Sequence, residues 1–80
     1  MKGYYRHYKH DPKGGANNHT YEVIGIGVHT ETNENLVIYK PLYKSKIKYY
    51  IRPLKMFNEI VEKSGKKIKR FIKIKNKKIS

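Results

Sequence analysis

The segment Thr20–Val28 most limits how this chain can fold, because its residues alternate with the period of a β-strand. This alternation predicts a strand with Val23, Gly25 and Gly27 on one face and an apolar ladder of Ile24, Ile26 and Val28 on the other. The two glycines leave one face nearly bare, which permits a bend or the close approach of another backbone. The chain is therefore expected to be built around a sheet.

Further short segments follow a strand-like pattern and are separated by residues typical of turns. The predicted strands are Tyr4–Lys9, Leu36–Tyr43, Ile47–Arg52, and a hairpin of Asn58–Lys63 and Lys66–Lys73 around Ser64-Gly65. Pro53 suits the first position of a helix, which predicts one helical turn over Pro53–Phe57. The pattern indicates a mainly β fold, either a small bent antiparallel sheet or an SH3-like or OB-like barrel of about five strands with one short helical turn.

The chain is short, and this limits its domain organisation. Its 80 residues predict a single domain over 1–80, with a core over 4–74 and a frayed tail over 75–80. The absence of cysteine excludes disulfides and thiolate zinc sites and fits a cytoplasmic location. No apolar run approaches the roughly 18 residues of a membrane span, so no membrane partner is expected.

The positive charge lies in one half of the chain. Residues 1–39 carry four basic and four acidic residues, whereas residues 40–80 carry 15 basic and two acidic residues, which accounts for the net charge of +13. This asymmetry favours a polyanionic partner over the alternative, a lysine-rich composition typical of an AT-rich genome, because the first half of the chain is neutral. The side chains expected to face a polyanion are Lys48, Lys66, Lys67, Lys69, Arg70 and Lys73.

The eight tyrosines are more than so small a core needs. Tyrosine beside arginine, histidine or lysine is the usual platform for a base or nucleotide, but it also simply stabilises strands. Arginine within a strand is costly without a partner, which is either a carboxylate such as that of Glu22 or Glu31, or a bound phosphate. The candidate ligand-binding residues are Arg6, His7, Tyr8, His29, Tyr39, Tyr43 and Arg52.

The sequence contains no arrangement of residues that predicts catalysis. There is no cysteine, the three serines lie in expected turns or the tail, and no glycine-rich phosphate loop is present. In a strand, His7 and His10 would point to opposite faces, which argues against a metal site. No catalytic residue, metal ligand or cofactor is therefore assigned, and the chain is expected not to be an enzyme.

Several motifs resemble those of a family of small bacterial and phage proteins that is catalogued as a domain of unknown function. They are Tyr5-Arg6-His7-Tyr8-Lys9, His29-Thr30-Glu31-Thr32 and Arg52-Pro53-Leu54 followed by Met56-Phe57, within a match over roughly residues 4–74. The chain departs from the family pattern at Lys69, where a proline usually precedes the Arg-Phe pair. The resemblance implies a compact β-rich fold and no particular activity.

These observations together predict a non-enzymatic binding module for a phosphate-bearing ligand. The first interpretation is nucleic acid held through its backbone, with weak sequence preference and strong salt dependence. The alternatives are a homo-oligomer that sequesters a small anionic nucleotide in a pocket, as some phage anti-defence proteins do, and a protein-interaction domain without a polyanionic ligand. A homo-oligomer would also compensate for the thin core of a short chain.

Overall fold

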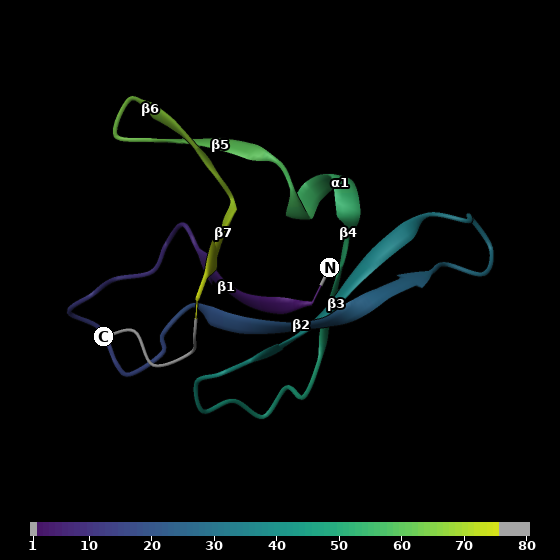
Figure 1. The fold of residues 1–80 in the computed structure, drawn as a ribbon, viewed down its shortest axis with the longest axis horizontal. Coiled ribbons are helices and arrows are strands. Elements are labelled where there is room, and N and C mark those ends of the chain that lie inside the picture. Colours follow the sequence, from purple (N-terminus) through teal and green to yellow (C-terminus); the bar gives the residue numbers. More distant parts are fainter. Residues whose placement is uncertain (1, 76–80) are drawn as a thin grey trace.

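The protein is described here by a computed structural model that covers residues 2–75, and its strands form a bent antiparallel sheet with a separate hairpin (Figure 1). The elements in chain order are β1 (Gly3–His7), β2 (Thr20–Val28), β3 (Asn35–Pro41), β4 (Tyr50–Pro53), α1 (Leu54–Phe57), β5 (Ile60–Lys63), β6 (Lys66–Lys69) and β7 (Phe71–Ile74). The five-stranded sheet has the order β4-β3-β2-β1-β7, and β5 pairs with β6 in the hairpin.

The mainly β fold, the small bent antiparallel sheet and the single helical turn predicted from the sequence are confirmed, whereas the alternative of a barrel is not. The described residues form seven strands rather than about five, and the sheet stays open between β4 and β7. The segment expected to form one strand over Lys66–Lys73 divides at Arg70. Hydrogen bonds from Arg70 N to Glu59 O and from Tyr8 N to Arg70 O, each 2.8 Å, redirect the chain there from the hairpin to β1.

Another predicted strand is shorter than expected. The strand expected over Ile47–Arg52 begins only at Tyr50 and runs to Pro53, where the helical turn follows. The tail expected over 75–80 lies outside the described residues, apart from Lys75.

A β-bulge at Ile24 changes which residues of β2 share a face. Val23 is opposite Tyr39 and Gly25 is opposite Ile38, which leaves Ile24 without a partner. Side chains directly opposite each other lie on the same face of a sheet. After the bulge, Ile26 and Val28 therefore join the face of Val23, whereas Gly25 and Gly27 move to the other face. The expected alternation along Thr20–Val28 is wrong beyond this point, because one extra residue exchanges the two faces.

The core lies on the inner face of the sheet, which we define as the face that α1 covers (Figure 1). Its buried members are largely aromatic: Tyr21, Val23, Val37, Tyr39, Phe57 and Phe71. The rings of Phe57 and Phe71 stack with 4.1 Å between centroids, and Tyr5 meets the Phe57 ring edge-on at 5.3 Å. Through Phe57, which is 1% exposed, the short helix α1 closes this core.

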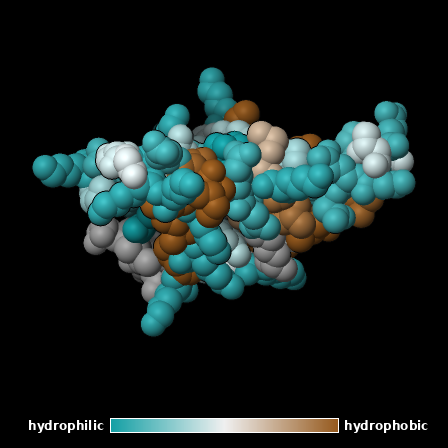
Figure 2. Space-filling view, turned by 90° about the horizontal axis from the view of Figure 1, so that it is seen from above, coloured by the Kyte–Doolittle hydropathy of each residue, from teal (hydrophilic) through white to brown (hydrophobic). Residues whose placement is uncertain are grey.

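The core is too small to enclose all the apolar side chains. Ile51 on the edge strand β4 is 65% exposed, and Val28 near the end of β2 is 59% exposed. On the face seen in Figure 2, hydrophobic areas are separated by hydrophilic side chains rather than joined into one patch. The apolar surface therefore does not mark a single docking area on this face.

Phe57 and Met56 provide a matched test of the core, because they are adjacent in α1 and only Phe57 is buried. Phe57→Ala should lower the free energy of unfolding by about 3–5 kcal/mol, since it removes a fully packed ring. Met56→Ala should cost less than about 1 kcal/mol. Urea denaturation measures both, and Phe57→Leu provides a milder variant if the alanine variant is unfolded. Equal effects at the two positions would contradict the proposed core.

Candidate functional site

A pocket of about 260 Å³ opens where the inner face of the sheet meets the loop between β1 and β2. Its lining comes from segments far apart in the sequence: His7, Lys9, His19, Tyr21, Tyr39, Tyr50, Arg52 and Phe71. Lys9 and His19 are exposed and form its rim, whereas Tyr39 and Phe71 belong to the core. Among the described residues, the lining contains basic and aromatic side chains and no carboxylate. This combination suits an anion that carries a planar group.

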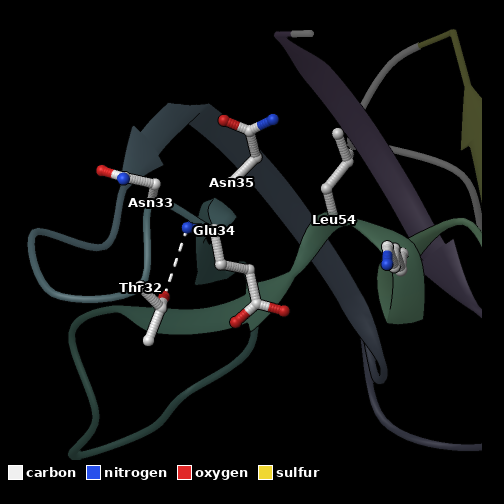
Figure 3. A pocket seen from close by; sticks show the side chains of 6 residues that line it. Thr32, Asn33, Glu34, Asn35 and Leu54 are labelled. Carbon is white, nitrogen blue, oxygen red and sulfur yellow. Dashed lines mark hydrogen bonds between the residues drawn. The ribbon is translucent and has the colours of Figure 1, made fainter.

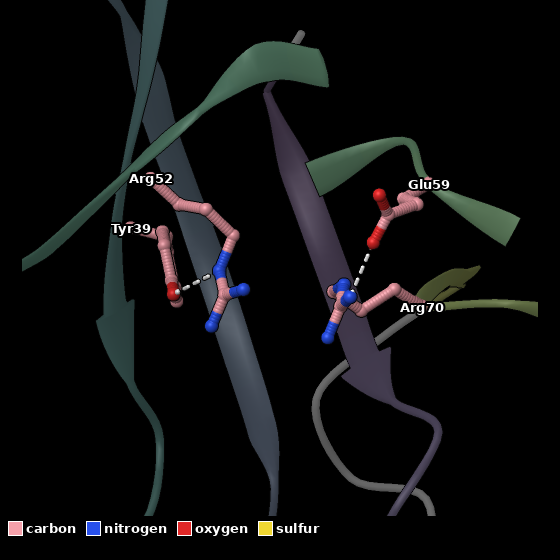
Figure 4. Close-up of polar contacts among 4 residues, drawn as sticks. All are labelled: Tyr39, Arg52, Glu59 and Arg70. Atoms are coloured by element: carbon pink, nitrogen blue, oxygen red, sulfur yellow. Dashed lines mark hydrogen bonds and ion pairs between the residues drawn. The ribbon is translucent and has the colours of Figure 1, made fainter. Parts of the chain in front are cut away.

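Arg52 enters the pocket from β4, where it is opposite the fully buried Val37 of β3. Its Nε donates a hydrogen bond of 3.3 Å to the Tyr39 hydroxyl, as Figure 4 shows. Its guanidinium carbon lies 5.6 Å from the centroid of the Phe71 ring. Within residues 2–75, Arg52 forms no ion pair, in contrast to Arg70, whose guanidinium is paired with Glu59. The Arg52 charge is therefore positioned by aromatic groups and left without a counter-ion in this part of the chain.

His7 borders the same pocket from the end of β1, opposite Phe71 of β7. Burial, together with smaller contributions from the neighbouring His19, Arg52, Arg70 and Lys9, lowers the pKa of His7 to about 4. The imidazole is therefore neutral at pH 7. Its Nδ1 accepts a hydrogen bond of 3.1 Å from the backbone N–H of Lys9, which leaves the ring proton on Nε2.

Tyr21 and Tyr43 keep their phenolic protons at neutral pH. The hydroxyl groups of Tyr21 and Tyr43 are 3.2 Å apart and share a hydrogen bond. Burial raises the pKa of both phenols. Tyr43 packs against the core without lining the pocket, whereas Tyr50 lines it and stacks on Tyr39 with 5.6 Å between ring centroids.

The remaining candidate ligand-binding residues lie elsewhere. Arg6 is opposite Thr20 and Ile72, on the face that does not carry the core. His29 lies in the β2–β3 turn, where its Nδ1 accepts hydrogen bonds from the backbone N–H groups of Glu31 and Thr32 at 3.1 and 3.3 Å. That role stabilises the turn.

Of the predicted ligand-binding set, the pocket unites His7, Tyr39 and Arg52, with the Tyr8 ring beside His7 at 4.6 Å. Sequence reasoning missed the other lining residues, which are Lys9, His19, Tyr21, Tyr50 and Phe71. The sequence does place aromatic residues in several predicted strands. Whether these residues meet in one pocket, however, depends on the order of the strands in the sheet.

The structure does not gather the residues predicted to face a polyanion on one surface. Lys66, Lys67 and Lys69 are exposed along β6, where neighbouring side chains alternate between faces. Lys48 lies in the β3–β4 connection, on the opposite side of the sheet from the hairpin in Figure 1. Lys73 is in β7, and Arg70 is engaged with Glu59.

A second hollow, of about 680 Å³, lies between the β2–β3 turn and α1 and is lined by Thr32, Asn33, Glu34, Asn35, Leu54 and Lys55. Although it is larger, it combines a carboxylate with an ammonium group. Figure 3 shows the Asn33, Glu34 and Asn35 side chains pointing in different directions. The Thr32 hydroxyl accepts a hydrogen bond of 3.2 Å from the Glu34 backbone N–H. The smaller pocket is the better candidate for an anion site, because its charged side chains are all basic and line the same pocket.

The part of the chain that the structure describes contains neither a metal-ligand cluster nor a membrane-spanning helix. No group of three or more histidine, aspartate or glutamate side chains there could hold a metal ion. None of its helices has the length and apolarity needed to cross a membrane.

The chain is thus a small, mainly β domain with a basic and aromatic pocket on the inner face of its sheet. It belongs to the family described as protein of unknown function DUF1653, whose model matches residues 3–73, and the resemblance seen in the sequence is confirmed. It is similar to the crystal structure of a DUF1653 protein from Bordetella bronchiseptica, with 31% identity, a TM-score of 0.76, and coverage of 92% of this chain and 86% of that one. No protein with a curated description matches it.

The lowered pKa of His7 predicts how stability depends on pH. Because the unfolded chain binds this proton more readily, the free energy of unfolding should decrease as the pH falls from about 6.5 to about 4. Burial also lowers the pKa of His10, which contributes in the same direction. Urea denaturation across this range measures the slope, and His7→Phe should make it shallower. An NMR titration midpoint of His7 near that of a solvated histidine would contradict this assignment.

Proposed function

We propose that this protein is a non-enzymatic binding module for a small phosphate-bearing ligand, which binds in the pocket around Arg52. The observation that carries the proposal is the Arg52 guanidinium, held by Tyr39 and Phe71 in a lining without carboxylates. Arginine forms charge-assisted, often bidentate hydrogen bonds with phosphate. Because its Nε already donates to Tyr39, the terminal nitrogens of the guanidinium remain to bind the anion.

The aromatic part of the pocket supports a nucleotide as the class of ligand. Tyr50 is half-buried and lines the pocket beside the buried Tyr39, so one wall combines an aromatic surface with the nearby arginine. Stacking of a base on an aromatic side chain is worth roughly 1–3 kcal/mol. A pocket of about 260 Å³ suits a single small nucleotide better than a length of polymer.

Nucleic acid held through its backbone is a second candidate, and the β5–β6 hairpin favours it. Lys66, Lys67 and Lys69 are exposed there, and the Lys63 ammonium donates a hydrogen bond of 3.0 Å to the Tyr8 carbonyl oxygen. This contact ties the lysine-rich hairpin to the segment that borders the pocket. The homo-oligomer and the cytoplasmic location expected from the sequence stay predictions, and sedimentation measures the first of them.

Arg52→Ala should separate pocket binding from general attraction to positive charge. We expect it to weaken the binding of 5′-AMP by at least about tenfold, because it removes the only arginine that lines the pocket. The control variant replaces Lys66, Lys67 and Lys69 by serine, and should change the affinity by less than about threefold. Calorimetric titration measures both. An unchanged affinity for Arg52→Ala would contradict the proposed site.

If the protein instead binds nucleic acid through its backbone, the two variants should have the opposite effects on binding of a fluorescent single-stranded oligonucleotide. Binding through the backbone should weaken by orders of magnitude between about 50 mM and about 200 mM salt. It should also be lost in the triple lysine variant and be retained in Arg52→Ala. Fluorescence anisotropy measures this, and binding that is insensitive to salt would rule out the backbone interpretation.

A further inference from the structure

We propose that the pocket selects a phosphate monoester, the terminal phosphate of a mononucleotide, and that His7 contributes a neutral N–H donor to it. This inference rests on the proposed function and narrows it to one kind of phosphate. It combines three features of the pocket: its fixed positive charges, the tautomer of His7 and the backbone that holds the His7 ring.

The first feature is the match between the charge of the pocket and the charge of the ligand. Among residues 2–75, the lining contains one arginine and one lysine, Arg52 and Lys9, and no carboxylate that offsets their charge. A phosphate monoester carries about −1.5 to −2 charges at pH 7, whereas a diester carries a single negative charge. Two cations around one small pocket therefore favour the monoester, whose additional charge lies on the same group.

The second feature is that the proton on the His7 ring has a fixed position. The Lys9 backbone N–H donates to Nδ1 at 3.1 Å, so Nδ1 must present its lone pair. The proton is thereby placed on Nε2, and the neutral ring can donate to an anion without first taking up a proton. A donor that needs no ionisation adds a hydrogen bond to phosphate and leaves the pocket charge unchanged.

The third feature is the support of the His7 ring before any ligand binds. The His7 backbone N–H donates to the His19 carbonyl oxygen at 2.8 Å, and His19 has a positive φ of 50°, which is uncommon for a residue other than glycine. The His7 ring meets the Phe71 ring edge-on at 5.0 Å and has the Tyr8 ring beside it at 4.6 Å. Contacts with β7 and with both ends of the β1–β2 loop therefore hold the donor in place.

These features make a specific prediction about pH. The pKa of His7 is lowered to about 4 by burial and by the groups that face it, which are His19, Arg52, Arg70 and Lys9. Between about pH 5 and about pH 8, the ring stays neutral, so its protonation does not set the affinity. The second ionisation of the phosphate, near pH 6, should set it instead.

The experiment compares 5′-AMP with 3′,5′-cyclic AMP, which share base and ribose but differ as monoester and diester. At pH 8, calorimetry should give an affinity for 5′-AMP at least about tenfold above that for the cyclic nucleotide. The 5′-AMP affinity should fall about tenfold between pH 8 and pH 5, as the phosphate gains a proton. The affinity for the cyclic nucleotide should stay constant. His19→Asn should leave the pH dependence of both affinities unchanged in shape, whatever its effect on the affinities themselves, which excludes the other imidazole as the origin of that dependence.

Two variants of His7 test the donor itself. His7→Phe keeps an aromatic ring beside Phe71 but removes the donor, and should weaken 5′-AMP binding about tenfold. His7→Gln retains an N–H donor at a similar distance from the backbone and should recover most of that loss. Circular dichroism establishes that both variants are folded, and an equal loss in both would overturn the role of the donor.

The other outcomes separate this inference from the proposed function. Equal binding of the two nucleotides, lost in Arg52→Ala, would leave the proposed function standing and overturn the preference for a monoester. An affinity that rises as the pH falls toward 5 would show that protonated histidine binds the ligand, and would overturn the neutral donor. If neither nucleotide binds in a manner that depends on Arg52, the proposed function fails and this inference fails with it.

Discussion

The stacking of Phe57 on Phe71 is the contact on which the rest of this structure depends. Phe57 comes from a helix of four residues, which is too short to be stable by itself, and Phe71 begins the last strand of the sheet. Their contact closes the core over the inner face and fixes β7 beside β1. Phe71 then serves a second purpose, because its ring also lies against the Arg52 guanidinium at the pocket. The packing that stabilises the fold therefore also positions the charge of the candidate site.

Local sequence patterns predict where most strands and the helical turn lie, but not where every strand ends or which residues share a face. The alternation of residues predicts the strand over Thr20–Val28 with its correct boundaries. Pro53 predicts the helical turn that follows it, because proline suits the first position of a helix. The bulge at Ile24 has no comparable signal, because the sequence alternates without interruption through it. Its position depends on the pairing with β3, which brings Tyr39 opposite Val23 and Ile38 opposite Gly25. A single unpaired residue then reverses the assignment of Ile26 and Val28.

The sequence predicts some individual residues of the site, but not how these residues are arranged in space. Arg52, His7 and Tyr39 were identified because charged and aromatic side chains in strands need partners. His29 satisfied the same criterion, yet its ring nitrogen is occupied by two backbone N–H groups of the β2–β3 turn. The pocket forms because the first strand pairs with the last one, which brings His7 opposite Phe71. Pairing between segments so distant in the sequence depends on the whole topology, and local pattern does not specify it.

The net charge of +13 and the candidate pocket are separate consequences of the sequence. Exposed lysines such as those of β6 are solvated, and at physiological ionic strength their field decays over about 8 Å. Arg52 differs because Tyr39 and Phe71 hold its guanidinium at the edge of a hydrophobic core, where water screens charge less. Under the proposed function, selectivity should therefore depend on a few side chains whose positions the aromatic core fixes, and the lysine excess should add only a general attraction to anions.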